Sequence, residues 1–258
     1  MPFYAGFDSG DYPGDASMRS LLADTNLVWC GFYLYPSDTW LPHYAAIKQM
    51  GWGVAPIYIG KQPSSAKLQA IISNHLGHKD ALNAALYANG KIDGDEAVAR
   101  AVQATIPPPC VIYFDVEEFT TLPAWLEYYR GWCRAVINHG YSVGLYAPTG
   151  QAKWVIDQLM AMRSFDIALP YVWSGTQSKV NPDPKVVPEA DFLSTPLPTP
   201  DPATPLASAT SWQHIGNYGI KWNDTTTTPG KTTHRRFAPI DFDSSVYRDP
   251  GLGFLSGV

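Results

Sequence analysis

Eight short apolar runs, most of them separated by amphipathic stretches, are the feature that most constrains the fold of this 258-residue chain. Such runs are typical of strands that are covered on both faces. Strands that alternate with helices predict a parallel sheet whose strands are joined by crossover helices. The predicted strands are Tyr4–Asp8, Val28–Leu34, Val54–Ile59, Val111–Val116, Ser142–Ala147, Ile167–Val172, Thr210–Ile215 and Pro239–Phe242.

The amphipathic stretches between these runs predict the outer helices. An acidic first turn in Asp93–Thr105 complements the helix dipole. The predicted helices are Ser17–Thr25, Asp38–Met50, Asp93–Thr105, Leu122–His139 and one between Ser142–Ala147 and Ile167–Val172. Eight such units close a ring, so we predict an α/β fold, a single (β/α)8 TIM-type barrel over residues 1–258. An open, doubly wound sheet would show the same alternation.

The alternation weakens in the final third of the chain. Asn181–Pro205 contains eight prolines and no strong helix pattern. Because proline fixes φ and removes a backbone donor, residues 181–205 are expected to form an extended surface loop or to be partly disordered. Asn223–Thr233, with four consecutive threonines, is a second irregular stretch. We therefore expect this part of the barrel to be irregular and poor in helices.

The charge and hydropathy of the chain argue against two classes of partner. The net charge is −5 and no block of Lys or Arg occurs, so a nucleic-acid-binding surface is not expected. No apolar run is long enough to cross a bilayer. The first residues lack a basic segment followed by an apolar one, so no signal peptide is expected. Export would require a leaderless route or a leader that has been removed.

The cysteine and aromatic residues are informative mainly about packing. The three cysteines are odd in number and form no C-x-x-C pair, so neither a disulfide framework nor a zinc site is indicated. Cys30 and Cys110 are expected to be buried thiols. Aromatic residues make up 13% of the chain. Their rings either fill the core or line a pocket mouth, where flat apolar faces suit sugar rings.

Acidic and amide side chains end several of the predicted strands. In a parallel barrel all C-terminal strand ends lie on one rim, where active sites are built. Asp8 and Asp241 come from the first and last strands, which are neighbours in a closed ring. These rim residues are Asp8, Asp115 to Glu118, Gln213, Asp241 and Asp243.

The Asp115–Glu117 pair is the most specific element of this set. Alternate residues of a strand share a face, so both carboxyl groups are expected to point the same way and Glu118 the other way. Two carboxylates held close do not both ionise easily, so one of them is expected to have a raised pKa. Cleavage of a glycosidic bond requires such an acid and a second group that assists the cationic centre or activates water.

Simpler roles compete for some of these residues. An acid after a strand also caps the next helix or pairs with a surface Arg, and this role stays open for Asp8. Asp243 with Ser244 also fits a turn. His75 and His78 share a predicted helix face but have no acidic or Cys partner, so no metal site is expected.

Further candidates for substrate binding lie near the strand ends. Trp173 and Trp212 are candidate sugar platforms, although Trp173 also suits the core. Gln213 follows Trp212, and because neighbouring strand residues face opposite sides, only one of the two is expected to reach the mouth. Tyr146, near the end of the fifth run, and Asp243 complete the candidate set.

Several segments across nearly the whole chain resemble a known family. They are GFDSGDYPG, WCGFYL, GWGVAPIYIGKQ, VIYFDVE, GYSVGLYAPTGQA, SWQHIGNYGIKW and PIDFDSS. Together they resemble the glycoside-hydrolase-like barrel domain once called domain of unknown function 1906. That domain is similar in turn to family 25 glycoside hydrolases, the Chalaropsis-type lysozymes.

This resemblance implies roles for the acids. In those lysozymes an Asp ends the first strand, a D-x-E ends the fourth, and an Asp lies in a V-D-x-N-like motif on the last; these match Asp8, Asp115 with Glu117, and Asp241. Glu117 would be the general acid. Asp115 would steer the substrate's N-acetyl group as an internal nucleophile or assist water. Asp8 and Asp241 would hold the substrate and stabilise positive charge.

Three functions follow from these observations, and the first is preferred. It is a hydrolase that cuts β-1,4 links in peptidoglycan or a related amino-sugar polymer, without metal or cofactor. The second is a glycan-binding barrel without turnover, because IDFD has Asp243 where the lysozymes usually have Asn; Trp212 with Gln213 still resembles their W-Q-Y strand. The third and weakest is a metal-dependent polysaccharide deacetylase, because Asp8 lies in an acidic turn but the H-x-x-x-H spacing is absent.

Overall fold

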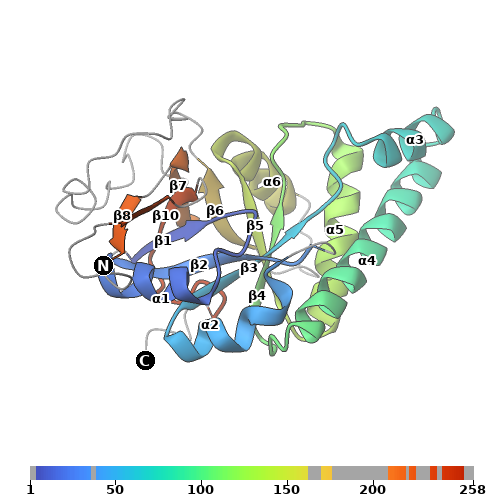
Figure 1. Cartoon of the computed structure of the whole chain (residues 1–258). Coiled ribbons are helices and arrows are strands. Elements are labelled where there is room, and N and C mark those ends of the chain that lie inside the picture. Colours follow the sequence, from blue (N-terminus) through green and yellow to red (C-terminus); the bar gives the residue numbers. More distant parts are fainter. Residues whose placement is uncertain are drawn as a thin grey trace.

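The central sheet is a ring of eight strands, seven of which run parallel (Figure 1). The structure, a computed structural model, describes residues 4–35, 39–161, 170–175, 209–218, 221–224, 233–236 and 240–252. The ring strands are β1 (Tyr4–Asp8), β2 (Leu27–Tyr33), β3 (Gly53–Ile59), β4 (Val111–Asp115), β5 (Ser142–Pro148), β6 (Tyr171–Gly175), β7 (Ala209–Tyr218) and β10 (Ile240–Ser245). A strand therefore overlaps each of the eight predicted runs.

Six α-helices lie in the described residues and connect the first six strands. They are α1 (Asp15–Asp24), α2 (Tyr44–Met50), α3 (Ala66–Asn74), α4 (Lys79–Gln103), α5 (Pro123–Asn138) and α6 (Thr149–Ala161), with a 3-10 turn, η1 (Leu41–His43), before α2. The predicted helix over Asp93–Thr105 is only the second half of α4. Among the described residues after α6, no helix occurs.

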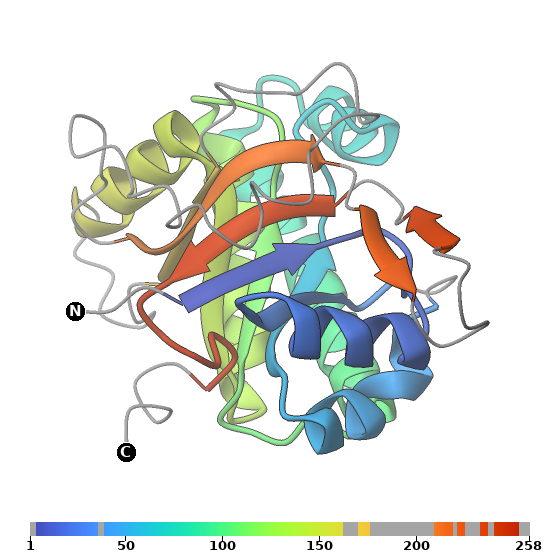
Figure 2. The same cartoon turned by 60° about the vertical axis from the view of Figure 1, so that its left-hand side comes forward.

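Strand β10 departs from the expected fold, because it runs antiparallel to both of its neighbours, β1 and β7. Figure 2 shows β10 between these two strands and pointing the opposite way. The regular (β/α)8 barrel of eight parallel strands is therefore wrong, whereas the α/β fold with a curled parallel sheet is confirmed. The physical reason is the connection: no crossover helix is described between β7 and β10, and antiparallel strands do not need one.

The segment between β7 and β10 contains two short strands. They are β8 (Lys221–Asp224) and β9 (Thr233–Arg236), which pair with each other in antiparallel register as a separate two-stranded sheet. The predicted irregular stretch Asn223–Thr233 thus overlaps the ends of both strands, and its residues 225–232 lie outside the described residues. The proline-rich stretch, residues 181–205, also lies outside them.

Aromatic rings fill much of the core. Six of the nine tryptophans, Trp29, Trp40, Trp52, Trp125, Trp132 and Trp173, are fully buried. The ring of Phe114 on β4 contacts four aromatic rings of α5, each in an edge-on geometry. Cys30, Cys110 and Cys133 are all free and buried, which confirms the expectation for the first two. Packing thus accounts for these aromatic rings.

Helices α4 and α5 pack closely along one side of the sheet (Figure 1). Two glycines permit the approach, one on each helix. A Cβ on Gly90 would lie 1.8 Å from the carbonyl oxygen of Tyr128, and a Cβ on Gly131 would lie 2.0 Å from that of Tyr87. No side chain larger than hydrogen fits at either position without a shift of the helices.

In the described part of the chain, no helix is long and apolar enough to span a membrane.

Candidate active site

Acidic residues from three remote segments meet at one rim of the sheet. Asp8 is the last residue of β1, and Asp115 is the last residue of β4. Asp241 is the second residue of β10 and pairs directly with Asp8. Because β10 is antiparallel, its beginning rather than its end lies beside the C-terminal ends of the parallel strands. The expected neighbourhood of Asp8 and Asp241 therefore exists, although the strand direction that creates it differs from the prediction.

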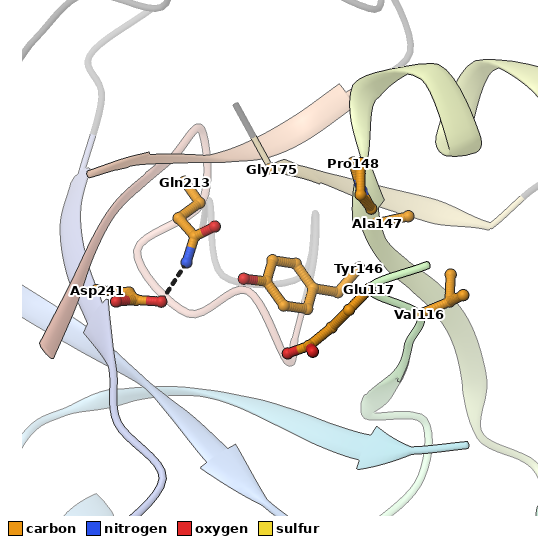
Figure 3. Close-up of a pocket in the computed structure, with 8 residues that line it drawn as sticks. All are labelled: Val116, Glu117, Tyr146, Ala147, Pro148, Gly175, Gln213 and Asp241. Carbon is orange, nitrogen blue, oxygen red and sulfur yellow. Dashed lines mark hydrogen bonds between the residues drawn. The ribbon is translucent and has the colours of Figure 1, made fainter. Parts of the chain in front are cut away.

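Two acids at this rim, Glu117 and Asp241, line a pocket of about 220 Å³ (Figure 3). Its lining residues are Val116, Glu117, Tyr146, Ala147, Pro148, Gly175, Gln213 and Asp241. In Figure 3 the Tyr146 ring lies between the Glu117 carboxylate and the Gln213–Asp241 pair, with its hydroxyl directed toward that pair. Gln213 donates from Nε2 to Asp241 Oδ2 across 2.5 Å. The pocket thus has an acid on each side of a tyrosine.

Behind the pocket, Asp8 and Asp243 form a hydrogen-bonded carboxyl pair. Both side chains are almost completely buried, and each affects the other's protonation through a side-chain hydrogen bond. Oδ2 of each residue has no protein donor. Since two carboxylates offer only acceptor atoms, a proton must lie on one of them for this bond to form.

Two neighbouring side chains complete the hydrogen bonds of this pair. Tyr33 on β2 donates from its hydroxyl to Asp8 Oδ1 across 2.8 Å. Trp173 on β6 donates from Nε1 to Asp243 Oδ1 across 3.1 Å. Burial, followed by the charge of Asp241, raises the pKa of Asp8 to about 7. Burial and then the charge of Asp8 raise the pKa of Asp243 well above its usual range.

The structure places Asp115 and Glu117 in different surroundings. Asp115 is buried, and burial followed by the charge of Glu117 raises its pKa well above the usual range. Glu117 is exposed and lines the pocket. Strand β4 ends at Asp115, so the alternation of faces used in the sequence analysis does not extend to Glu117. Glu118 does point elsewhere, because its carboxylate accepts hydrogen bonds from Ser64.

A residue that sequence reasoning missed, Gln62, holds the backbone around the pair. Its Oε1 accepts from the amide of Glu117 at 2.9 Å and from that of Glu118 at 3.3 Å. Its Nε2 donates to the carbonyl of Asp115 at 3.1 Å. Gln62 lies after β3, so one side chain ties the ends of two neighbouring strands together. Its only signal in the sequence is its place two residues after Gly60, at the end of a predicted strand.

The structure places the predicted aromatic residues in different surroundings. Tyr146 lines the pocket, and burial followed by the charges of Asp8 and Asp243 raises its pKa well above the usual range. Trp173 is fully buried, so its ring does not face the pocket as a sugar platform; it contacts Asp243 instead. The side chain of Trp212 lies outside the described set, whereas Gln213 reaches the pocket.

The described residues contain no group of three or more His, Cys, Asp or Glu side chains arranged to hold a metal ion. A deacetylase of the metal-dependent kind therefore gains no support from this part of the chain. The arrangement suits proton transfer instead: an exposed glutamate and an aspartate line the pocket, and buried carboxyl groups with raised pKa values lie near them.

Residues 34–234 match the model of the Rv2525c-like, glycoside hydrolase-like domain. A search of curated proteins gave no match.

Several solved structures share the fold at low sequence identity. An uncharacterised protein of Bacillus stearothermophilus is 20% identical over 95% of this chain and 96% of its own, with a TM-score of 0.60. The Tat-secreted protein Rv2525c of Mycobacterium tuberculosis is 14% identical over 96% and 97%, with a TM-score of 0.52. The spore cortex lytic enzyme SleM of Clostridium perfringens is 11% identical over 94% of this chain and 67% of its own, also with a TM-score of 0.52.

Proposed function

This chain belongs to the Rv2525c-like family of glycoside hydrolase-like domains, and from that membership and its acidic pocket we propose that it is a glycoside hydrolase. The substrate proposed is the glycan of cell-wall peptidoglycan or a related amino-sugar polymer. One observation carries the proposal: Glu117, which follows β4, and Asp241 of β10 line a single pocket, and the buried Asp8 of β1 pairs directly with Asp241. The fold shared with a spore cortex lytic enzyme supports the choice of a cell-wall glycan.

Glu117 is the proposed general acid. It is the acid of the Asp115–Glu117 pair that lines the pocket, so it is the one that a bound sugar touches. A sugar covering Glu117 would exclude water from around its carboxyl. Glu117 then donates its proton to the leaving glycosidic oxygen as the bond from that oxygen to the anomeric carbon breaks.

Negative charge nearby stabilises the cationic centre that this step creates. Asp241 lines the pocket opposite Glu117 and carries this role, while the buried Asp8 supports it from behind. Asp115 is buried with a raised pKa, so we assign it polarisation of the substrate's N-acetyl group or of water rather than direct attack. Water finally adds to the anomeric carbon and its proton returns to a carboxylate of the site.

The proposal is tested with purified peptidoglycan. The unmodified protein is expected to clear a peptidoglycan suspension and to release soluble sugar fragments that mass spectrometry detects. Glu117→Gln keeps the size of the side chain but removes the acid, so clearing is expected to fall at least about a hundredfold. Asp157→Asn on α6, which removes only an exposed pair with Lys153, is the matched control. Equal clearing by the Glu117→Gln variant would show that the assignment is wrong.

A second candidate, a glycan-binding barrel without turnover, is favoured by a specific observation. Tyr146, Gln213 and Asp241 line the pocket with hydroxyl, amide and carboxyl groups, which hydrogen-bond to sugar hydroxyls without any chemical step. This candidate predicts that the unmodified protein sediments with peptidoglycan but releases no fragments. Fragment release that Glu117→Gln abolishes would decide against it.

A further inference from the structure

The backbone that follows Glu117 is held at two points by side-chain amides. On one side Gln62 accepts hydrogen bonds from the amides of Glu117 and Glu118. On the other side Gln151 of α6, which is fully buried, accepts a hydrogen bond of 2.7 Å from the amide of Thr120. One residue, Phe119, lies between these two anchors.

Phe119 is exposed although its backbone is fixed. Its side chain is 62% exposed. Other large apolar residues with similar exposure lie within or directly after outer helices: Leu76 follows α3, Ile92 and Val102 are in α4, and Met160 is in α6. Single exposed apolar side chains are common and carry little meaning on their own. Phe119 differs from these because it follows a pocket residue, Glu117, by two positions.

The ring of Phe119 also packs against a residue that lies close in sequence to the pocket lining. A Cβ placed on Gly150 would lie 3.6 Å from Cε2 of Phe119, so the ring packs over this glycine. Gly150 follows Pro148 by two residues, and Pro148 and Glu117 both line the pocket. The ring therefore lies beside the pocket, between the segment that carries Glu117 and the start of α6.

We propose that Phe119 is an outer subsite on which a sugar ring of the glycan stacks as the chain leaves the pocket. This subsite rests on the proposed function, because its occupant is the same polymer that enters the pocket. The apolar face of a pyranose covers the exposed ring and removes apolar surface from water. The two amide anchors fix the backbone on either side of Phe119 before binding, which lowers the entropy lost when the sugar docks.

The subsite is tested by binding of β-1,4-linked N-acetylglucosamine oligomers, measured by calorimetry. All variants carry Glu117→Gln so that cleavage does not interfere. A hexasaccharide extends well beyond a pocket of about 220 Å³, whereas a disaccharide is expected to occupy the pocket without covering Phe119. Phe119→Ala is expected to weaken hexasaccharide binding about tenfold, or ~1.4 kcal/mol, and to leave disaccharide binding unchanged.

Two substitutions separate stacking from other effects. Phe119→Trp keeps an aromatic face and is expected to retain hexasaccharide binding, whereas Phe119→Leu keeps only apolar character and is expected to lose most of it. Leu76→Ala removes an apolar side chain that is 71% exposed beyond α3 and is the matched control. Circular dichroism and thermal unfolding check that each variant is folded.

The possible failures are distinguishable. If Phe119→Ala weakens both oligomers equally, or neither, the subsite is wrong while the pocket stands. If the Glu117→Gln protein with its native Phe119 binds neither the oligomers nor peptidoglycan strands, the proposed function fails and the subsite fails with it. If Phe119→Leu retains hexasaccharide binding, a general apolar contact rather than stacking explains the binding, and the proposal is overturned.

Discussion

Trp173 donates its indole hydrogen to Oδ1 of Asp243 across 3.1 Å, inside the ring of strands. Both side chains are buried, and Asp243 is in turn hydrogen-bonded to Asp8. Trp173 is therefore connected to the acidic pocket through the carboxyl groups of Asp243 and Asp8. Its role is not direct contact with a sugar. A hydrogen bond to a buried acid fixes its position and limits its rotamers, so Trp173 supports the site from below.

Trp173→Phe is expected to destabilise the protein by ~1–3 kcal/mol beyond the effect of the ring change, because it leaves Asp243 Oδ1 buried without its donor. Trp125→Phe is the matched control. Trp125 is equally buried, but its Nε1 has no hydrogen-bond partner, so its replacement by Phe breaks no hydrogen bond. Urea unfolding of both variants gives the comparison. Equal losses would mean that the Trp173–Asp243 bond contributes nothing measurable.

The shared proton between Asp8 and Asp243 makes stability depend on pH. The pKa of Asp8 is about 7 in the folded protein, against an ordinary value of 3.8. Between these values the folded protein keeps a proton that the unfolded chain has released. The free energy of unfolding is therefore expected to fall as the pH rises from about 4 to about 7. Below about pH 4 this contribution is fully present.

The Asp243→Asn substitution is expected to make the free energy of unfolding fall less steeply as the pH rises. The amide offers Asp8 a donor at every pH and keeps an oxygen for Trp173, so the bond between the two residues no longer needs a proton. Between pH 4 and pH 7, the free energy of unfolding of the variant is expected to rise by on the order of 1–3 kcal/mol relative to that of the unmodified protein. Some slope remains, because burial and the charge of Asp241 still raise the pKa of Asp8, and Asp115 also has a raised pKa. Urea unfolding across this range is the measurement, with Asp157→Asn as control; parallel curves for the variant and the unmodified protein would contradict the shared proton.

Local patterns in the sequence account for much of the fold. Apolar runs such as Val54–Ile59 and Val111–Val116 have nearly the same bounds as the observed strands. Strands buried on both faces have no polar positions that interrupt the apolar run. The direction of β10 could not be predicted in this way. A strand has the same composition in either direction, and only the connection from β7 decides which way it runs.

The candidate site was predictable only in part, for a related reason. Asp8 and Asp115 end apolar runs, so their place on the rim follows from the parallel topology, whereas Asp241 lies there because β10 is antiparallel and begins at this rim. Gln62 was missed because its role depends on a contact 55 residues away with the amide of Glu117. Trp173 was ambiguous because strand position alone does not say whether a large ring fills the core or faces a pocket.

The close approach of α4 and α5 gives a prediction about packing. Gly131→Ala would place a Cβ 2.0 Å from the carbonyl oxygen of Tyr87, so the helices must move apart. We expect a loss of ~1–3 kcal/mol or more in the free energy of unfolding, although alanine favours helices. Gly10→Ala is the control, since nothing lies within 4 Å of the added Cβ. A Gly131→Ala variant as stable as Gly10→Ala would contradict the observed helix crossing.

Gln62 is expected to position Glu117 rather than to contact the substrate. It binds the backbone of Asp115, Glu117 and Glu118, and it is not among the residues that line the pocket. Gln62→Ala is expected to raise the hydrogen-exchange rate of the Glu117 and Glu118 amides, because both lose their acceptor. In the proposed hydrolase, kcat is expected to fall about tenfold to a hundredfold with a smaller change in KM, since a displaced acid transfers its proton poorly.

Asn89→Ala is the matched control for Gln62→Ala. Asn89 donates to a carbonyl within its own helix, α4, and does not contact the segment after β4. The control is expected to change neither amide exchange at Glu117 nor kcat. Gln62→Glu keeps the oxygen that accepts from the two amides but loses the donor to the Asp115 carbonyl, so exchange is expected to stay close to that of the unmodified protein. Fast amide exchange in Gln62→Ala with unchanged kcat would mean that the order of this segment does not affect the reaction. Gln62 would then have no part in the proposed mechanism.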